Sequence, residues 1–169
     1  MNCDLVDPSA KRIADFLAEI GLEIVCEEIN DETFLPGILV RNGRVVVDKE
    51  KLAFPGDLLH EAGHLALAPG AIRSTLSGEV AFPGVQMEPV ESSVMAWSYA
   101  AALYLEVDPK IVFHNAGYRG ASDRLLFNFS VGAYIGVNGL QDAGLTITRQ
   151  AAIDRGIPPY PHMIKWLRD

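Results

Sequence analysis

The sequence has few cysteines, few basic side chains and no long hydrophobic run. Its two cysteines, Cys3 and Cys26, form no CxxC pair, which excludes a disulfide framework and favours a reduced, cytoplasmic protein. Lysine and arginine number 14 against 22 aspartates and glutamates, which gives a net charge of −8. This balance argues against a partner that is a nucleic acid or an anionic membrane, because both require basic protein surface.

The longest apolar stretches span residues 94–105 and 125–137, and polar residues interrupt both. Each is shorter than the roughly 20 residues that a membrane span requires, so we expect buried helices. The first residues carry charge at once, so no signal peptide is expected. With 49% hydrophobic residues in a chain of 169, we expect one domain, residues 1–169, with its own core.

Local patterns predict an α+β fold, with a small N-terminal antiparallel sheet packed on a mainly helical part. Asn42-Gly43 stands between two β-branched runs and predicts a hairpin with strands at 37–41 and 44–48. Alternating residues at 22–27 predict a further, weak strand. Helices are predicted from Pro8 to Gly21, at about 57–68 and 89–106, after Pro109, at 122–137 with Asn138-Gly139 as its end, and from 148 to Gly156, with an irregular segment at 70–87.

The predicted helix at 57–68 contains His60-Glu61-Ala62-Gly63-His64, an HExxH pattern. Histidines at positions i and i+4 lie on one helical face, so both imidazoles reach the same metal ion. Glu61 is rotated by about 100° from His60, which suits a general base that accepts a proton from water. Gly63 permits close approach of another backbone or of a substrate. The pattern predicts a zinc (Zn²⁺) site with Glu61 as the catalytic base.

A catalytic zinc site needs a third protein ligand and an open position. We expect Glu91 to be this ligand, because the 27 residues after His64 allow the Ala-rich helix that it opens to fold back against the first helix. Glu88 is the alternative, and Glu79 lies in the connection between the helices. The candidates considered are Glu79, Glu88, Glu91, His114 and His162.

This order of elements resembles the ImmA/IrrE-type zinc metallopeptidases and, more broadly, the gluzincins. The matching segments lie within residues 37–105 and read GILVRNGRVVVD, FPGDLLHEAGHLAL and VESSVMAWSYAAALYL. The resemblance implies a zincin-like fold, zinc ligands at His60, His64 and Glu91, and Glu61 as the catalytic base. Residues 106–169 are expected to form a helical C-terminal part of the same domain.

Peptide hydrolysis also needs a hydrogen-bond donor for the negative charge that develops on the carbonyl oxygen. His114, in the segment VFHNAGYRG, is our candidate for this catalytic role, and Tyr118 and Arg119 follow it closely. The alternative for His114 is a cap on exposed helix carbonyls. A carboxylate that orients a histidine ligand is also expected, and Asp57 and Glu79 are both candidates.

Five other side chains are expected to be structural. These are Tyr99, His162, Trp97, Trp166 and Phe127, the last three as core residues.

Three functions agree with the sequence. The first is a zinc-dependent hydrolase, most simply a peptidase that acts on a peptide or protein substrate. The second is a non-catalytic zinc-binding protein that senses or regulates through a protein partner. The third is a small helical interaction domain with an accidental HExxH pattern, which would bind no metal. The sequence carries no signal for an oligomeric state.

Overall fold

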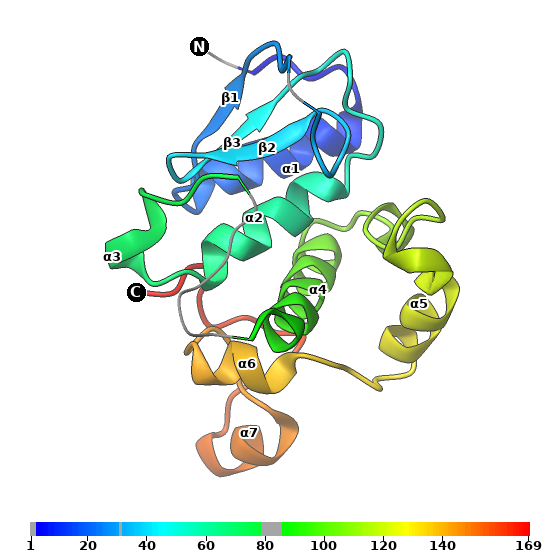
Figure 1. Cartoon of the computed structure of the whole chain (residues 1–169). Helices are drawn as coiled ribbons and strands as arrows, with labels where there is room; N and C mark the ends of the chain where they lie inside the picture. The colour runs from blue at the N-terminus through cyan, green and yellow to red at the C-terminus, as the bar shows by residue number, and fades with distance from the viewer. Residues whose placement is uncertain (1–2, 31, 79–85) are drawn as a thin grey trace.

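A small sheet and a larger set of helices make up the chain, which confirms the predicted α+β fold (Figure 1). The computed structural model describes residues 3–30, 32–78 and 86–169, without the side chains of Met87 and Glu88. The helices and strands, in chain order, are α1 (Pro8–Glu19), β1 (Ile24–Cys26), β2 (Ile38–Arg41), β3 (Arg44–Val47), α2 (Asp57–Leu67), α3 (Gly70–Arg73), α4 (Met87–Tyr104), the short 3₁₀ segments η1 (Pro109–Ile111) and η2 (Tyr118–Gly120), α5 (Ser122–Ser130), α6 (Val137–Asp142) and α7 (Arg149–Arg155).

The sheet has the strand order β1-β3-β2. Asn42 and Gly43 have φ angles of 51° and 71° and form the tight turn that the sequence predicts between β2 and β3. These two strands are antiparallel, whereas β1 pairs with β3 in parallel. The sheet is therefore mixed rather than wholly antiparallel. The reason is that β1 lies beside β3 and not beside β2. The chain reverses direction twice between β1 and β3, so these two strands run parallel.

The core lies between the sheet and the helices α1 and α2. Ile38, Val40, Val45 and Val47 alternate along β2 and β3 and are buried in one cluster with residues of both helices. In α1 the apolar residues Ile13, Phe16 and Leu17 are buried, and the Asp7 side chain caps the first turn by accepting from the Ala10 N–H at 2.9 Å. The sheet and α1 thus form a support on which α2 is fixed.

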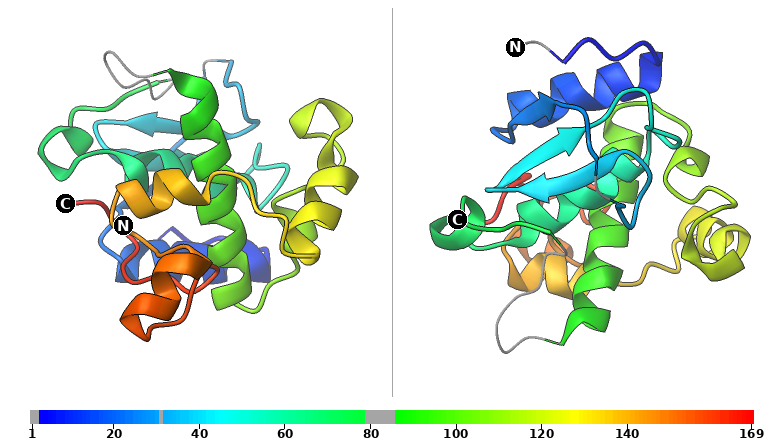
Figure 2. Two further views of the ribbon diagram at one scale, coloured as in Figure 1. Left: turned by 90° about the horizontal axis from the view of Figure 1, so that it is seen from below. Right: turned by 45° about the horizontal axis from the view of Figure 1, so that its top comes forward.

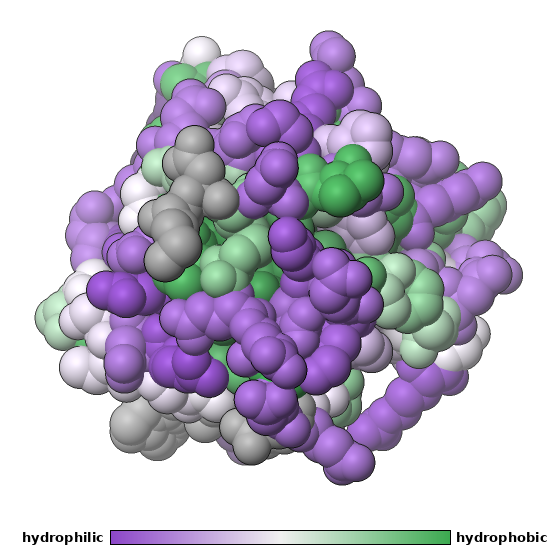
Figure 3. Space-filling model, turned by 90° about the horizontal axis from the view of Figure 1, so that it is seen from above, coloured by the Kyte–Doolittle hydropathy of each residue, from purple (hydrophilic) through white to green (hydrophobic). Residues whose placement is uncertain are grey.

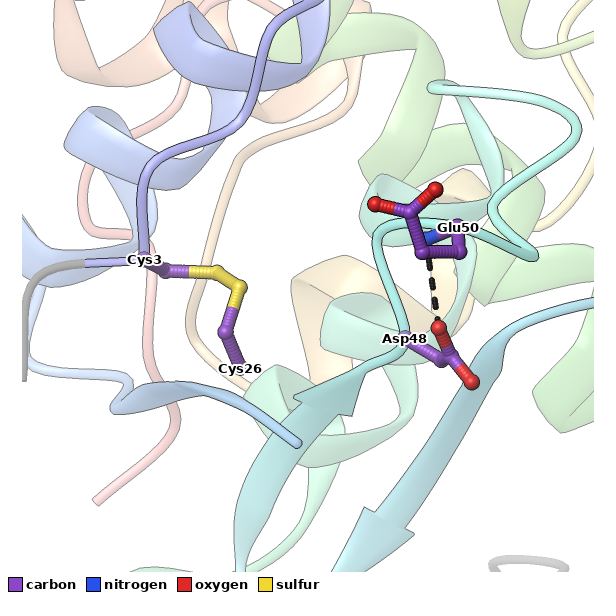
Figure 4. The surroundings of a disulfide bond; sticks show 4 residues. All are labelled: Cys3, Cys26, Asp48 and Glu50. Atoms are coloured by element: carbon purple, nitrogen blue, oxygen red, sulfur yellow. Dashed lines mark hydrogen bonds between the residues drawn. A yellow bond between two sulfur atoms is a disulfide. The ribbon is translucent and has the colours of Figure 1, made fainter. Parts of the chain in front are cut away.

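A disulfide joins Cys3, before α1, to Cys26 at the end of β1 (Figure 4). Their Cα atoms are 5.1 Å apart, within the usual range for such bonds. The expectation of reduced cysteines is wrong for this pair. The α1 helix rises about 18 Å over its length, and the extended chain from Gly21 to Cys26 covers a similar distance of about 17 Å. A strand that returns along the helix therefore brings the two thiols together.

The turn after β3 is closed by a buried carboxylate, that of Asp48 (Figure 4). Its oxygens accept hydrogen bonds from the backbone N–H groups of Ile29 and Glu50, both at 3.1 Å. The Lys51 ammonium lies 3.4 Å away. Since these groups satisfy the charge of Asp48, the carboxylate fixes the chain between β3 and α2.

The predicted helix at 122–137 is wrong. The α5 helix ends at Ser130, and Gly132 and Gly136 follow in left-handed conformations with φ angles of 79° and 78°. Asn138 and Gly139, expected to end that helix, lie inside α6. The apolar run at 125–137 is also not buried throughout, because Phe127 is 64% exposed. Phe127 is therefore not a core residue, whereas Trp97 is fully buried and Trp166 packs partly buried against the core.

The remaining predicted helices are present. α4 occupies the predicted Ala-rich segment, and α7 ends at Gly156 as expected. The segment predicted to be irregular contains the one-turn helix α3, and residues 79–85 of it lie outside the described residues. Figure 2 shows α6 lying across α4 on the side away from the sheet.

The C-terminal segment returns to the end of α2. The Arg168 N–H donates to the Ala66 carbonyl at 2.9 Å. The Trp97 indole donates to the Trp166 carbonyl at 3.0 Å. The Arg73 guanidinium donates to the carbonyls of Leu65, Ala68 and Arg168. The bonds to the Leu65 and Ala66 carbonyls satisfy end carbonyls that have no partner within α2 itself.

The surface seen from the side of the sheet is mainly hydrophilic, with separate hydrophobic patches (Figure 3). Within the described ranges, the helices are all too short or too polar to cross a bilayer.

Candidate metal centre

The helix that carries the HExxH pattern, α2, is packed closely against α4. A Cβ atom on Gly63 would lie only 3.0 Å from Cγ1 of Val94, so the absent side chain permits the close approach that the sequence predicts. The buried hydroxyl of Ser98 donates to the Leu59 carbonyl at 3.1 Å and links the two helices further. This packing places the first turns of α4 opposite the imidazoles of α2.

His60, His64 and Glu91 converge at this helix contact. The Nε2 atom of His60 lies 3.4 Å from one oxygen of the Glu91 carboxylate, and that of His64 lies 3.2 Å from the other. The potential ligand atoms of the three residues all lie within 4.8 Å of one another. The structure therefore brings together the two histidines and the glutamate expected as metal ligands. In the described part of the chain, no other group of three histidines, cysteines or acids is gathered in this way.

These distances suit a tetrahedral ion. Zinc bonds to nitrogen and oxygen of about 2.0–2.1 Å place neighbouring tetrahedral ligands about 3.3–3.4 Å apart. The two measured nitrogen-to-oxygen distances, 3.4 and 3.2 Å, are close to this value but end on different oxygens of Glu91. With one ligand atom taken from each residue, the three atoms lie within 4.8 Å of one another. The donor set of two imidazoles and one carboxylate is also typical of catalytic zinc, and it leaves a fourth position for water or substrate. The residues present therefore fit the ion that the sequence predicts.

The protonation of the three side chains follows from burial and from their contacts. Burial, aided by the charge of His60, lowers the pKa of His64 to about 4, so this imidazole is neutral at pH 7 and able to bind a metal. Burial alone would lower the pKa of His60 and raise that of Glu91. The hydrogen bond between these two residues, together with nearby charges, reverses both directions, so the pKa of His60 is raised and that of Glu91 is lowered.

Glu61 follows His60 on α2 and is half-buried. Its negative charge contributes to the raised pKa of His60. It does not belong to the group of three converging residues. The role of general base, which needs a carboxylate beside a metal ion and not bound to it, stays a prediction for Glu61.

Two other acids considered as ligands lie outside the described residues. Glu79 falls in the gap at 79–85, and the side chain of Glu88 is not described although its backbone belongs to α4. His162 is exposed near the C-terminus, as expected for a residue outside the site.

His114 forms a buried pair with Asp57 of the first turn of α2. Its Nε2 atom lies 2.9 Å from Oδ1 of Asp57, and its ring stacks on Phe54 at 3.9 Å between centroids. The other polar atoms of the pair, Nδ1 of His114 and Oδ2 of Asp57, are buried without a hydrogen-bond partner among the described residues. Burial raises the pKa of Asp57, against the opposing effects of His114 and His60. Asp57 therefore orients His114 and not a histidine of the cluster.

Tyr118 lies next to His60, in a strained segment. Tyr118, Arg119 and Gly120 have φ angles of 54°, 52° and 79°, and a left-handed conformation costs a residue other than glycine about 1–2 kcal/mol. The Tyr118 ring lies edge-on to His60, at 6.2 Å between centroids. Burial, and then the charges of Asp57 and Glu91, raise its pKa, so the phenol stays protonated at neutral pH.

The other aromatic candidate, Tyr99, belongs to the core. It is buried between Phe113 and Phe129, and its hydroxyl lies 3.5 Å from the Phe129 carbonyl. Arg119 is exposed.

Sequence reasoning missed the pairing of His114 with Asp57, because 57 residues separate them. The available signal was that Asp57 precedes His60 by three positions and so shares its face of α2.

Comparisons of the chain with models of protein families, with curated proteins and with solved structures found no match. A functional conclusion therefore rests on the geometry of this site.

Proposed function

We propose that the chain is a zinc-dependent hydrolase, most simply a peptidase of the ImmA/IrrE-like type. The observation that carries this proposal is the convergence of His60, His64 and Glu91 from two helices, with Glu61 beside them on α2. In this proposal the two imidazoles bind through Nε2 and the Glu91 carboxylate supplies the third ligand. Bound zinc would supply a Lewis acid that brings the pKa of water towards 7 and polarises a carbonyl group.

The residues of the chain have separate tasks in this reaction. His64 is neutral because it is buried, so it offers a lone pair without first losing a proton. Glu61 accepts a proton from the attacking water and delivers it to the nitrogen of the leaving amine. The carbonyl oxygen then requires a hydrogen-bond donor from the wall of the site.

The first test is the metal content of protein purified without a metal-affinity step. We expect about one zinc per chain in the wild type, as for a site with three protein ligands, and loss of the metal in His64→Ala. His162→Ala is the matched control, because this histidine is exposed and outside the cluster; it should retain the metal. Absence of metal from the wild type, even after zinc is added, would contradict the proposal and leave Glu91 in polar contact with His60 and His64.

The second test separates catalysis from metal binding. Glu61→Gln keeps the shape of the side chain but removes the base, so the zinc content should be unchanged. Cleavage of labelled casein and of a mixture of quenched peptides should fall about 10²–10⁴-fold. If zinc is bound, no peptide is cut and the substitution has no effect, the site is a sensing or regulatory one that acts through a protein partner.

A further inference from the structure

The proposed hydrolase needs a hydrogen-bond donor for the carbonyl oxygen, and the geometry of His114 does not provide it. Its Nε2 atom is held by Asp57 at 2.9 Å, and its Nδ1 atom is buried away from solvent. Neither ring nitrogen is therefore presented to a substrate. A donor that remains available has to come from another side chain next to the cluster.

Tyr118 meets this requirement. Its ring lies edge-on to that of His60 at 6.2 Å between centroids, so the phenol lies next to a residue of the cluster. Within the described ranges its hydroxyl has no hydrogen-bond partner, in contrast to that of Tyr160, which donates to the Ala96 carbonyl at 2.8 Å. The phenol is thus a donor that no described residue uses.

The pair of Asp57 and His114 holds the segment that carries Tyr118. His114 is fixed by its bond to Asp57 and by the stack on Phe54. The Ser122 hydroxyl lies 2.6 Å from the His114 carbonyl and 3.3 Å from that of Gly117, so it closes the loop from both ends. The left-handed conformation of Tyr118 is maintained inside this loop.

We propose that Tyr118 is a catalytic residue that donates a hydrogen bond from its phenol to the carbonyl oxygen of the scissile bond, and that Asp57 and His114 are positioning residues for it. This inference rests on the proposed hydrolase function. His114 accordingly acts through Tyr118 and does not touch the substrate.

The first experiment compares Tyr118→Phe with Tyr104→Phe in the zinc-loaded protein. Both changes remove one hydroxyl and keep the ring, and Tyr104 is an exposed residue at the end of α4. We expect Tyr118→Phe to lower kcat about 10²–10³-fold with KM and zinc content unchanged, and Tyr104→Phe to have no effect. A phosphinic peptide, which mimics the tetrahedral carbonyl adduct, should bind Tyr118→Phe more weakly by a similar factor in calorimetry.

The second experiment tests the positioning role. His114→Ala should lower kcat, and His114→Gln should restore part of it, because the glutamine amide also reaches Asp57. The double variant His114→Ala, Tyr118→Phe should be no slower than Tyr118→Phe alone. In the metal-free protein, the ¹³Cζ resonance of Tyr118 should shift in His114→Ala and not in His162→Ala.

The outcomes separate the two proposals. If the wild type cuts peptides, Glu61→Gln is inactive and Tyr118→Phe retains full kcat, the role of Tyr118 is refuted and the hydrolase stands. Additive losses in the double variant would refute the positioning role of His114. A wild type that binds zinc and hydrolyses nothing would overturn the hydrolase and this inference together.

Discussion

Gly136 packs against the turn of α4 that carries Glu91. Replacement of Gly136 by alanine directly tests whether this contact supports Glu91. Its φ angle is 78°, and an added Cβ atom would lie 2.0 Å from the carbonyl oxygen of Ser92, the residue after Glu91. The Ser93 hydroxyl lies 3.0 Å from the Gly136 carbonyl at the same contact. Gly132 is the matched control, because its φ angle is 79° and an added Cβ atom there meets nothing within 4 Å.

The two substitutions share one cost and differ in the other. A left-handed alanine costs about 1–2 kcal/mol at either site. Only at Gly136 must the two backbones move apart, so that the added Cβ atom lies at least 3.4 Å and not 2.0 Å from the Ser92 oxygen, which adds about 1–3 kcal/mol. In a chain of this size each kcal/mol lowers Tm by about 2–4 °C. Gly132→Ala should therefore lower Tm by about 2–8 °C, and Gly136→Ala by about 2–12 °C more.

The assay has two readouts. Thermal unfolding followed by circular dichroism, with chelator present, measures the stability of the metal-free variants. Zinc affinity is then measured by competition with a chromogenic chelator. Gly136→Ala displaces the backbone next to Glu91, so we expect about 10–100-fold weaker zinc binding, as when other supports of a ligand are removed. Gly132→Ala should bind zinc like the wild type.

Equal changes in Tm for the two variants would refute the argument from backbone contact. A Gly136→Ala protein that is destabilised but binds zinc with unchanged affinity would refute the support of Glu91 by α6.

Two further predictions concern the disulfide and pH. Cys3 and Cys26 are 23 residues apart in sequence, so reduction of their disulfide should lower the free energy of unfolding by about 3 kcal/mol. In calorimetry this should lower Tm by about 6–12 °C. A Cys3→Ser, Cys26→Ser variant should not respond to reductant, and identical wild-type scans with and without reductant would contradict the prediction. In chelated protein, His64 has a pKa of about 4 when folded against 6.5 when unfolded, so the unfolded chain binds more protons and stability should fall as pH decreases from 6.5 to 4, by about 3 kcal/mol. His60 has a raised pKa and opposes this change. The dependence of the unfolding free energy on pH is therefore measured by urea unfolding for both the wild type and His64→Gln. Equal dependence in the two proteins would contradict the lowered pKa of His64.

The elements closest to the candidate site were predictable because they depend on local rules. The spacing of His60 and His64 follows from helix periodicity, and Asn42-Gly43 favours left-handed angles at both central positions of a hairpin. The choice of Glu91 needed only the length of the connection and an Ala-rich helix able to pack against Gly63.

The features that could not be predicted depend on contacts between distant parts of the chain. The apolar run at 125–137 looks like one buried helix, but Gly132 and Gly136 take left-handed angles and Phe127 faces solvent. Hydrophobicity does not reveal which neighbours are available to cover a helix. The pairing of Cys3 with Cys26 depends on the return of β1 along α1, which composition does not encode.

The arrangement of Asp57, His114 and Tyr118 beside the cluster was only partly predictable from the sequence. The sequence named all three as candidates, with Asp57 or Glu79 for orienting a histidine ligand and His114 as the candidate donor. The contact between Asp57 and His114 joins segments 57 residues apart, and the left-handed angle of Tyr118 lies within η2. Side-chain roles of this kind are fixed by packing and not by spacing.

The hydrogen bond from Arg168 to the end of α2 has a consequence for how the site assembles during translation. The donor follows the Ala66 carbonyl by roughly a hundred residues, which a ribosome adds in about 5–20 s. Glu91 is synthesised much earlier in this interval. His60, His64 and Glu91 are therefore synthesised before Arg168, which donates the hydrogen bond to the end of α2. During synthesis, the nascent chain would carry these side chains while the end of α2 still lacks its hydrogen bond from Arg168. The candidate metal centre would then reach its final structure only after residues 166–168 are synthesised.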